Sequence, residues 1–214
     1  WELGVRGASL TWSRRNDLAN GCCKAGQRVQ IPGGLSLEGI RAVEEMERLG
    51  MFLDVSHLND DGFEDICRIA KKPFVATHSN SRQVFFNYRN LNDSQIRRLA
   101  EQGGMMGLNG CDCIVGCADG GDALEMLCRH VESMAALAGI DKVGYGLDFC
   151  DSYGEAEPRY VFAQERHDSL VDHSHVPELT AALLQRGMPA EDVKKVMGGN
   201  WIEYFRRTLP QNGS

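Results

Sequence analysis

The sequence predicts an α/β fold in which parallel strands alternate with helices. Short apolar runs recur along the 214 residues, and stretches with helical periodicity separate them. The runs at residues 51–55 and 104–108 are almost continuously apolar, which is typical of parallel strands buried on both faces. No two-residue turn signal joins two alternating runs, so hairpins are not indicated. We therefore expect a single domain over residues 1–214, with no linker and no internal repeat.

Five strands are expected, and helices lie between them and after the last one. The expected strands span residues 5–12, 51–57, 73–78, 105–109 and 143–148. The expected helices span residues 36–50, 60–70, 92–101, 124–139 and 177–186, and a last amphipathic helix carries residues 193–205.

Residues with strong positional preferences mark several of these helix ends. Ser36 is placed to cap the first helix, and Gly50 to end it. Asn92 followed by Gln95 predicts a reciprocal capping box at the start of the third helix. Pro177 at a first-turn position predicts the start of the fifth.

Composition limits the function classes. Charged residues make up 25% of the chain and the formal net charge is −7, so no nucleic-acid footprint is expected. No apolar segment approaches the roughly 18 residues that a membrane helix requires. The opening at Trp1 resembles the last turn of a helix capped by Gly4. We therefore expect that the natural start lies upstream, which leaves the localisation open between cytoplasm and periplasm.

Eight cysteines are unevenly distributed. Cys67 and Cys128 fall within helical patterns, where small buried thiols are expected. The others follow expected strands; they are Cys22, Cys23, Cys111, Cys113, Cys117 and Cys150. Their spacing does not match the usual zinc motif. Free thiols, a disulfide within this group and a second metal site all remain open.

Polar or amphipathic side chains end the expected strands: Trp12, His57, His78, Asn109 and Asp148. The carboxyl ends of parallel strands are where βα folds build active sites. A single histidine at such a place is more often a satisfied core residue. Two matched histidines together with an aspartate favour a site.

Metal binding explains these residue types. A neutral imidazole binds Zn²⁺ well when its other nitrogen donates to an oriented acceptor. Two histidines do not fill a zinc site, so His57 and His78 would need further ligands. Asp148 could be a ligand, a general base or a group that holds a substrate amine.

Several motifs together resemble a known family. They are Leu10-Thr-Trp-Ser-Arg-Arg-Asn-Asp-Leu-Ala-Asn-Gly21, Leu53-Asp-Val-Ser-His57, Thr77-His-Ser-Asn-Ser, Tyr88-Arg-Asn90, Gly144-Tyr-Gly-Leu-Asp-Phe149 and Gly198-Gly-Asn200. In order and content they resemble the membrane (renal) dipeptidase family, peptidase family M19, and its bacterial-type members.

The resemblance implies a (β/α)₈ TIM-type barrel of the metallo-dependent hydrolase kind, with this chain covering about strands four to eight. It also implies a centre of two zinc ions that hydrolyses dipeptides. By the same resemblance, His57 and His78 bind the second zinc, Arg89 holds the substrate carboxylate, and Asp148 is the catalytic aspartate near the attacking water and the substrate amine.

The sequence departs from the family pattern in three places. The His-x-Asp pair and the bridging glutamate do not occur, and we expect them upstream of Trp1. Trp12 stands where mammalian members carry a substrate-contacting histidine. The Cys111–Cys117 loop replaces a substrate-contacting tyrosine. Trp12 and Asn109 are therefore taken, with Arg89, as candidate substrate contacts.

The expected function is zinc-dependent dipeptide hydrolysis, with this chain supplying half of the metal site and the carboxylate clamp. One alternative is an inactive fragment, or a piece of a split barrel that needs an N-terminal partner segment. Another is a related barrel amidohydrolase. The expected partners are a dipeptide substrate and either a second copy of the chain or the missing N-terminal segment.

Overall fold

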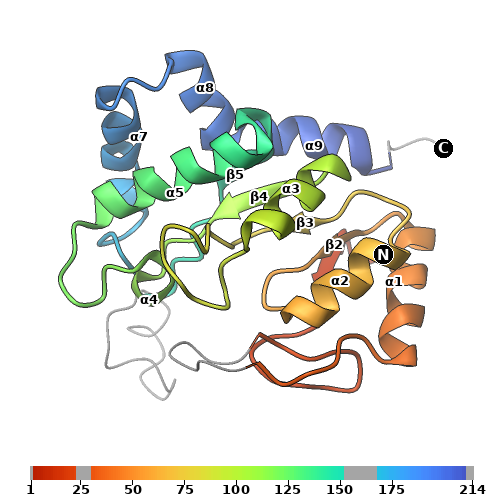
Figure 1. Ribbon diagram of the computed structural model, residues 1–214. Coiled ribbons are helices and arrows are strands. Elements are labelled where there is room, and N and C mark those ends of the chain that lie inside the picture. Colours follow the sequence, from red (N-terminus) through yellow and green to blue (C-terminus); the bar gives the residue numbers. More distant parts are fainter. Residues whose placement is uncertain (1, 23–29, 152–167, 211–214) are drawn as a thin grey trace.

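A computed structural model describes residues 2–22, 30–151 and 168–210 of the chain (Figure 1). Trp1 and Cys23 lie outside the described residues. The strands form one five-stranded parallel sheet in sequential order: β1 (Gly7–Ser9), β2 (Phe52–Asp54), β3 (Val75–Ala76), β4 (Met105–Leu108) and β5 (Val143–Tyr145). The predicted α/β fold with a parallel sheet is confirmed.

Helices separate the strands as predicted. They are α1 (Leu37–Leu49), α2 (Asp60–Ile69), α3 (Asp93–Glu101), α4 (Asp112–Val115), α5 (Ala123–Ala138), α7 (Val176–Gln185), α8 (Ala190–Lys194) and α9 (Asn200–Thr208). Helices α1 and α2 lie at one end of the molecule, and α7 and α8 at the other (Figure 1). No helix among the described residues is both long enough and apolar enough to cross a membrane.

The predicted caps are present. The Ser36 side chain accepts a hydrogen bond from the Gly39 amide, and Gly50 ends α1 in the left-handed conformation at φ 70°. Asn92 and Gln95 form the predicted reciprocal capping box of α3. These local interactions fix where each helix begins relative to the strand before it.

The expected last helix is interrupted. Its first part is α8, a π-helical turn follows at Lys195–Gly199, and Gly198 inside that turn has non-helical backbone angles. The chain resumes as α9, where the Asn200 side-chain amide donates to the carbonyls of Ile140 and Val143, each at 2.8 Å. The glycine pair therefore redirects the chain so that Asn200 ties α9 to the start of β5.

Strands β3 and β4, in the middle of the sheet, are buried on both faces. Val75 and Met105 pack with Tyr204 of α9 in one cluster, whereas their neighbours Ala76 and Met106 belong to the main core. This alternation confirms the expectation drawn from the continuously apolar strands. It also holds the strand ends rigidly, which positions the loops that follow them.

Candidate active site

The candidate residues lie in the loops that follow the strands. His57, His78, Asn109 and Asp148 come just after the last residues of β2, β3, β4 and β5. The strands are shorter than the apolar runs suggested, because the chain leaves the hydrogen-bonded ladder before each polar residue. Since the strands are parallel, these loops share one edge of the sheet.

The structure brings the histidines, the aspartate and the tryptophan together. The ring centroids of His57 and His78 are 5.0 Å apart. The Nε2 atom of His78 lies 3.9 Å from Oδ2 of Asp148. The indole of Trp12 is 57% exposed, and its ring centroid lies 6.0 Å from that of His57. These side chains therefore border one common space.

A hydroxyl relay orients His78. Nδ1 of His78 lies 2.7 Å from the Thr77 hydroxyl, which in turn donates to Oδ2 of Asp54 at 2.5 Å. Because the hydroxyl proton goes to the carboxylate, the hydroxyl oxygen is left to accept from Nδ1–H of His78. Nε2 of His78 is then the unprotonated nitrogen, and it lies on the Asp148 side of the ring.

His57 is held in place through its backbone carbonyl. Its carbonyl accepts from the Thr11 hydroxyl at 3.1 Å and from the Cys22 amide at 2.8 Å. Nδ1 of the ring is buried without a partner among the described residues. A buried imidazole nitrogen left in this state costs free energy unless a ligand completes it.

Both imidazoles are kept neutral. Burial, aided by the positive charge of Arg89 and by His78, lowers the pKa of His57 to about 2. Burial and Arg89 also lower the pKa of His78, although Asp148 and Asp54 oppose that shift. A neutral imidazole offers a lone pair, so the two rings have the chemical form that a divalent metal ion requires.

Asn109 is a buried connection between neighbouring loops. Its side-chain amide donates to Oδ2 of Asp148 at 3.3 Å, and its side-chain oxygen accepts from the Cys111 amide at 2.7 Å. The Asn80 side chain pairs with the Asn109 backbone, at 2.8 Å to the amide and 3.0 Å to the carbonyl. Asn109 thus helps to fix the position of the Asp148 carboxylate.

Arg89 is a buried cation that has no carboxylate partner within the described part of the chain. Its side chain donates to the His78 carbonyl at 3.0 Å and to the Ser79 hydroxyl at 3.3 Å, and the residue is only 5% exposed. Its Nε atom is buried and unpartnered. Among the described residues, no ion pair involves Arg89. An unpaired buried guanidinium is costly and is suited to bind an anionic ligand.

Two glycines allow the site strands to approach closely. A Cβ atom at Gly107 or Gly146 would lie within 1.8 or 1.9 Å of the Thr77 carbonyl oxygen. Glycine at these positions therefore lets β3, β4 and β5 converge behind His78. This close approach explains the second glycine of the Gly144-Tyr-Gly-Leu-Asp motif.

Cys67 and Cys128 lie inside helices, as the sequence predicted. Cys67 and Cys128 are buried in α2 and α5. Burial raises the pKa of each of these thiols to about 11, so they stay protonated.

Next to the site, the sulfurs of Cys111 and Cys113 lie 3.4 Å apart. The hydrogen bond between them raises the pKa of the Cys111 thiol and lowers that of Cys113.

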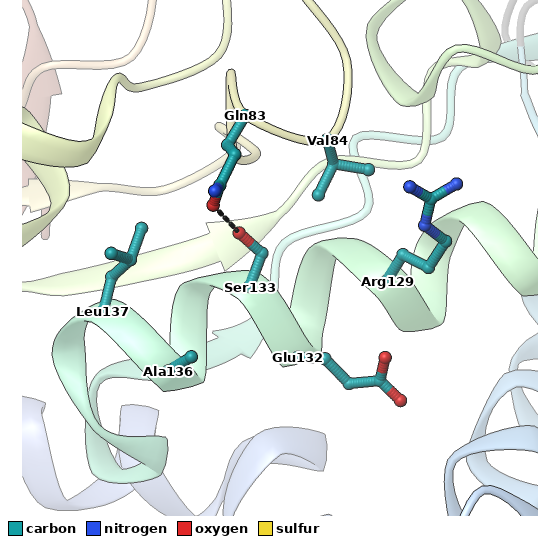
Figure 2. A pocket seen from close by; sticks show the side chains of 7 residues that line it. All are labelled: Gln83, Val84, Arg129, Glu132, Ser133, Ala136 and Leu137. Atoms are coloured by element: carbon teal, nitrogen blue, oxygen red, sulfur yellow. Dashed lines mark hydrogen bonds between the residues drawn. The ribbon is translucent and has the colours of Figure 1, made fainter.

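A groove elsewhere on the surface does not coincide with this cluster. The groove has a volume of about 460 Å³ and lies between α5 and the loop of Gln83 and Val84. The Ser133 hydroxyl donates to the Gln83 side chain across it at 3.4 Å (Figure 2). None of the candidate residues lines it. The convergent buried polar groups, rather than this groove, define the candidate active site.

Three functional positions carried no assigned role in the sequence. Asp54 and Thr77 orient His78, and Asn80 holds Asn109. Each stands within a motif that marked the family resemblance, and Asp54 is a carboxylate inside an otherwise apolar strand. A buried charged residue at such a position was the available signal.

Comparisons with known proteins agree with one another. The model for the family described as Membrane dipeptidase (Peptidase family M19) matches residues 1–210. Dipeptidase tcpJ of Claviceps purpurea (strain 20.1) is 29% identical over 204 residues, which is 95% of this chain and 45% of the relative.

Two solved structures have the same fold over nearly the whole chain. A metallo peptidase from Rhodobacter sphaeroides, liganded with a phosphinate mimic of the dipeptide L-Ala-D-Ala, has a TM-score of 0.82 and 31% identity, covering 97% of this chain and 57% of that one. An amidohydrolase from Pseudomonas aeruginosa has a TM-score of 0.82 and 25% identity, covering 98% of this chain and 66% of that one. This chain thus spans about half to two thirds of the length of these relatives.

Proposed function

Because the chain belongs to the membrane dipeptidase family, peptidase family M19, we propose that it forms part of a zinc-dependent dipeptidase and supplies one half of a two-zinc site together with the clamp for the substrate carboxylate. Residues 1–214 then form one domain and contribute strands four to eight of a (β/α)₈ barrel. The remaining strands would join the sheet at its edge strands, β1 and β5.

The observation that carries this proposal is Arg89. Its buried guanidinium has no carboxylate partner among the described residues, and its Nε is unsatisfied. A dipeptide brings a terminal carboxylate that a guanidinium can bind through two parallel hydrogen bonds. The Rhodobacter relative was solved with a phosphinate mimic of the dipeptide L-Ala-D-Ala, and that dipeptide has a terminal carboxylate.

The residues present fit a metal ion on chemical grounds. Nδ1 of His57 is a buried acceptor without a partner, and the Thr77 relay leaves Nε2 of His78 unprotonated. His57 and His78 would hold zinc, and residues outside this chain would complete the centre. When bound, zinc supplies Lewis-acid stabilisation of the charge that develops on the scissile carbonyl.

The chain's own residues would bind and position the substrate. Arg89 holds the terminal carboxylate, which fixes the scissile bond relative to Asp148. Asp148 is half exposed, with its side chain 49% accessible, and can take a proton at its carboxylate from the attacking water and pass it to the leaving amine. Asn109 keeps that carboxylate turned toward the histidines. The exposed indole of Trp12, beside His57, would contact the substrate.

Two other functions are compatible with the same residues. The chain could be a piece of a split barrel that is inactive without the segment carrying strands one to three, because its two histidines do not fill a zinc site. A related amidohydrolase activity is favoured by the likeness to the Pseudomonas aeruginosa structure. Assembly would be with that N-terminal segment or with a second copy of the chain.

One experiment separates these functions. The chain, alone and joined to an N-terminal segment of a close relative that carries the remaining strands, is assayed with zinc against L-Ala-D-Ala and its C-terminal amide. We expect cleavage of the free acid by the joined protein only, and at least tenfold slower cleavage of the amide. Equal rates on acid and amide would overturn the carboxylate clamp and favour the amidohydrolase.

A further inference from the structure

Outside the histidine cluster, three potential metal ligands gather at the start of the short helix α4, which follows β4. One sulfur each from Cys111 and Cys113 and a carboxylate oxygen of Asp112 all lie within 4.8 Å of one another. The three residues are half-buried. No role in the proposed dipeptidase reaction uses them.

The backbone that carries these ligands is fixed by side-chain amides. Asn109 accepts from the Cys111 amide at 2.7 Å, and Asn87 donates to the Cys113 carbonyl at 2.9 Å. Asn90 donates to the Ile114 carbonyl at 2.9 Å. Because the main chain is held on both sides of Asp112, the two sulfurs are kept together before any ligand arrives. Such preorganisation lowers the entropic cost of binding.

The separation of the two hydrogen-bonded sulfurs is closer to that of a metal site than to that of a disulfide. Two thiolates on one tetrahedral zinc ion, each at about 2.3 Å, are about 3.8 Å apart. A disulfide requires about 2.05 Å. The observed distance of 3.4 Å is therefore about 0.4 Å from the metal arrangement and about 1.4 Å from the disulfide. With the loop backbone fixed, the smaller displacement is the accessible one.

We propose that Cys111, Asp112 and Cys113 bind a thiophilic divalent cation of the zinc group, at a site separate from the histidine centre. Two sulfur ligands select such cations over magnesium or calcium, and the carboxylate adds a third ligand. On binding, the two thiol protons pass to solvent and both sulfurs become thiolates. A tetrahedral ion then keeps its fourth position for water.

Cadmium is the probe, because cadmium thiolates absorb in the ultraviolet whereas cadmium held by imidazole and carboxylate does not. The full chain, reduced and metal-free, is titrated with Cd²⁺. We expect a thiolate-to-cadmium band that saturates at about one equivalent and disappears in Cys111→Ser and in Cys113→Ser. Cys150→Ser, which removes an exposed thiol of a neighbouring loop, is the matched control and keeps the band. Asp112→Asn keeps the band and weakens binding several-fold.

A second measurement needs no variant. Cd²⁺ should protect Cys111 and Cys113 of the unaltered chain from alkylation, as read by peptide mass, while Cys150 stays reactive. The proposal is overturned if Cys111→Ser and Cys113→Ser keep the full band, or if Cd²⁺ protects neither thiol.

Discussion

His57 and Asp148 share an unusual backbone conformation: they are the two non-glycine residues with positive φ in the described part of the chain, at 71° and 57°. Each follows a strand, and each carries a candidate catalytic or metal-binding side chain. The left-handed region costs an ordinary residue about 1–2 kcal/mol. Strain of this kind clusters at functional sites, where the loop aims a side chain that a relaxed backbone would turn away.

Two replacements of Asp148 distinguish the effect of its left-handed backbone on stability from the role of its carboxylate in catalysis. Asn tolerates the left-handed region and keeps an oxygen that can accept from Asn109, so Asp148→Asn should leave the free energy of unfolding unchanged. It removes the carboxylate, so kcat in the complete enzyme should fall by about 10²-fold or more. Asp148→Ala should lose the same activity and also about 1 kcal/mol of stability.

Urea denaturation and steady-state kinetics measure both effects. Asp119→Asn, an exposed carboxylate away from the site, is the control for charge removal. Wild-type kcat in Asp148→Asn would rule out a catalytic role for this carboxylate.

Removal of the Thr77 hydroxyl should weaken metal binding without removing a ligand. Thr77→Val leaves Nδ1–H of His78 without its acceptor, so Nε2 is no longer the favoured free nitrogen. Loss of such outer partners typically costs about 10–100-fold in metal affinity. Thr77→Ser keeps the hydroxyl and should restore binding, whereas His57→Ala and His78→Ala should abolish both activity and zinc binding at the histidine centre.

Isothermal titration of the metal-free protein with zinc measures these affinities. If Thr77→Val binds zinc as tightly as the original protein, the relay through Asp54 does not position His78.

Gly146→Ala should destabilise the fold behind the site. Its Cβ would lie 1.9 Å from the Thr77 carbonyl oxygen, a backbone atom that cannot rotate away. Overpacking of this kind costs about 1–3 kcal/mol. Gly121→Ala, whose Cβ would have its nearest neighbour at 3.4 Å, is the matched control and should change the free energy of unfolding by less than about 1 kcal/mol. Equal denaturation midpoints for the two variants would contradict this account of the strand approach.

His130 should make stability depend on pH. It is fully buried, Nε2 donates to the Val115 carbonyl at 3.0 Å, and Nδ1 accepts from the Ser81 amide at 3.3 Å. Burial lowers its pKa from 6.5 to about 4. The unfolded chain therefore binds the proton more readily between these values, so stability is complete above about pH 6.5 and falls as the pH drops toward 4.

The loss amounts to about 3 kcal/mol at most, since each pKa unit is worth about 1.36 kcal/mol. The free energy of unfolding of His130→Gln, followed by urea denaturation at a series of pH values, should decline less steeply through this range. If the free energy of unfolding of His130→Gln declines with falling pH as steeply as that of the original protein, groups other than His130 cause the pH dependence.

Much of the fold was predictable because its signals are local. Ser36, Gly50 and the Asn92–Gln95 box mark helix ends through contacts within a few residues, and the apolar runs mark the strands. The break at Gly198 was not predictable from periodicity, since the apolar spacing continues across it. Only the long-range bonds from Asn200 to the carbonyls of Ile140 and Val143 show why the chain turns there.

The residues of the candidate site were predictable from the sequence, but the hydrogen bonds that orient them were not. The sequence placed His57, His78 and Asp148 at strand ends, and parallel topology then brings them together. The orienting roles of Asp54 and Thr77 depend on hydrogen bonds between strands, and the unpaired state of Arg89 depends on what lies around it. Neither property has a signature in residue spacing.

Arg89 offers a prediction in which function and stability move in opposite directions. Arg89→Met keeps most of the side-chain volume and removes a buried charge that has no carboxylate partner among the described residues. Because an uncompensated buried charge is unfavourable, the melting temperature of the metal-free protein should stay equal or rise despite the lost bonds to His78 and Ser79. Dipeptide hydrolysis should instead lose about 2–5 kcal/mol in kcat/KM, the range for truncating one partner of a buried charge pair.

Arg89→Lys keeps the positive charge but lacks the two parallel donors of a guanidinium, so it should recover only part of that loss. Arg97→Lys, on the exposed face of α3, controls for arginine replacement in general. A fall in melting temperature together with unchanged kcat/KM would show that Arg89 is a structural residue and that no carboxylate binds there.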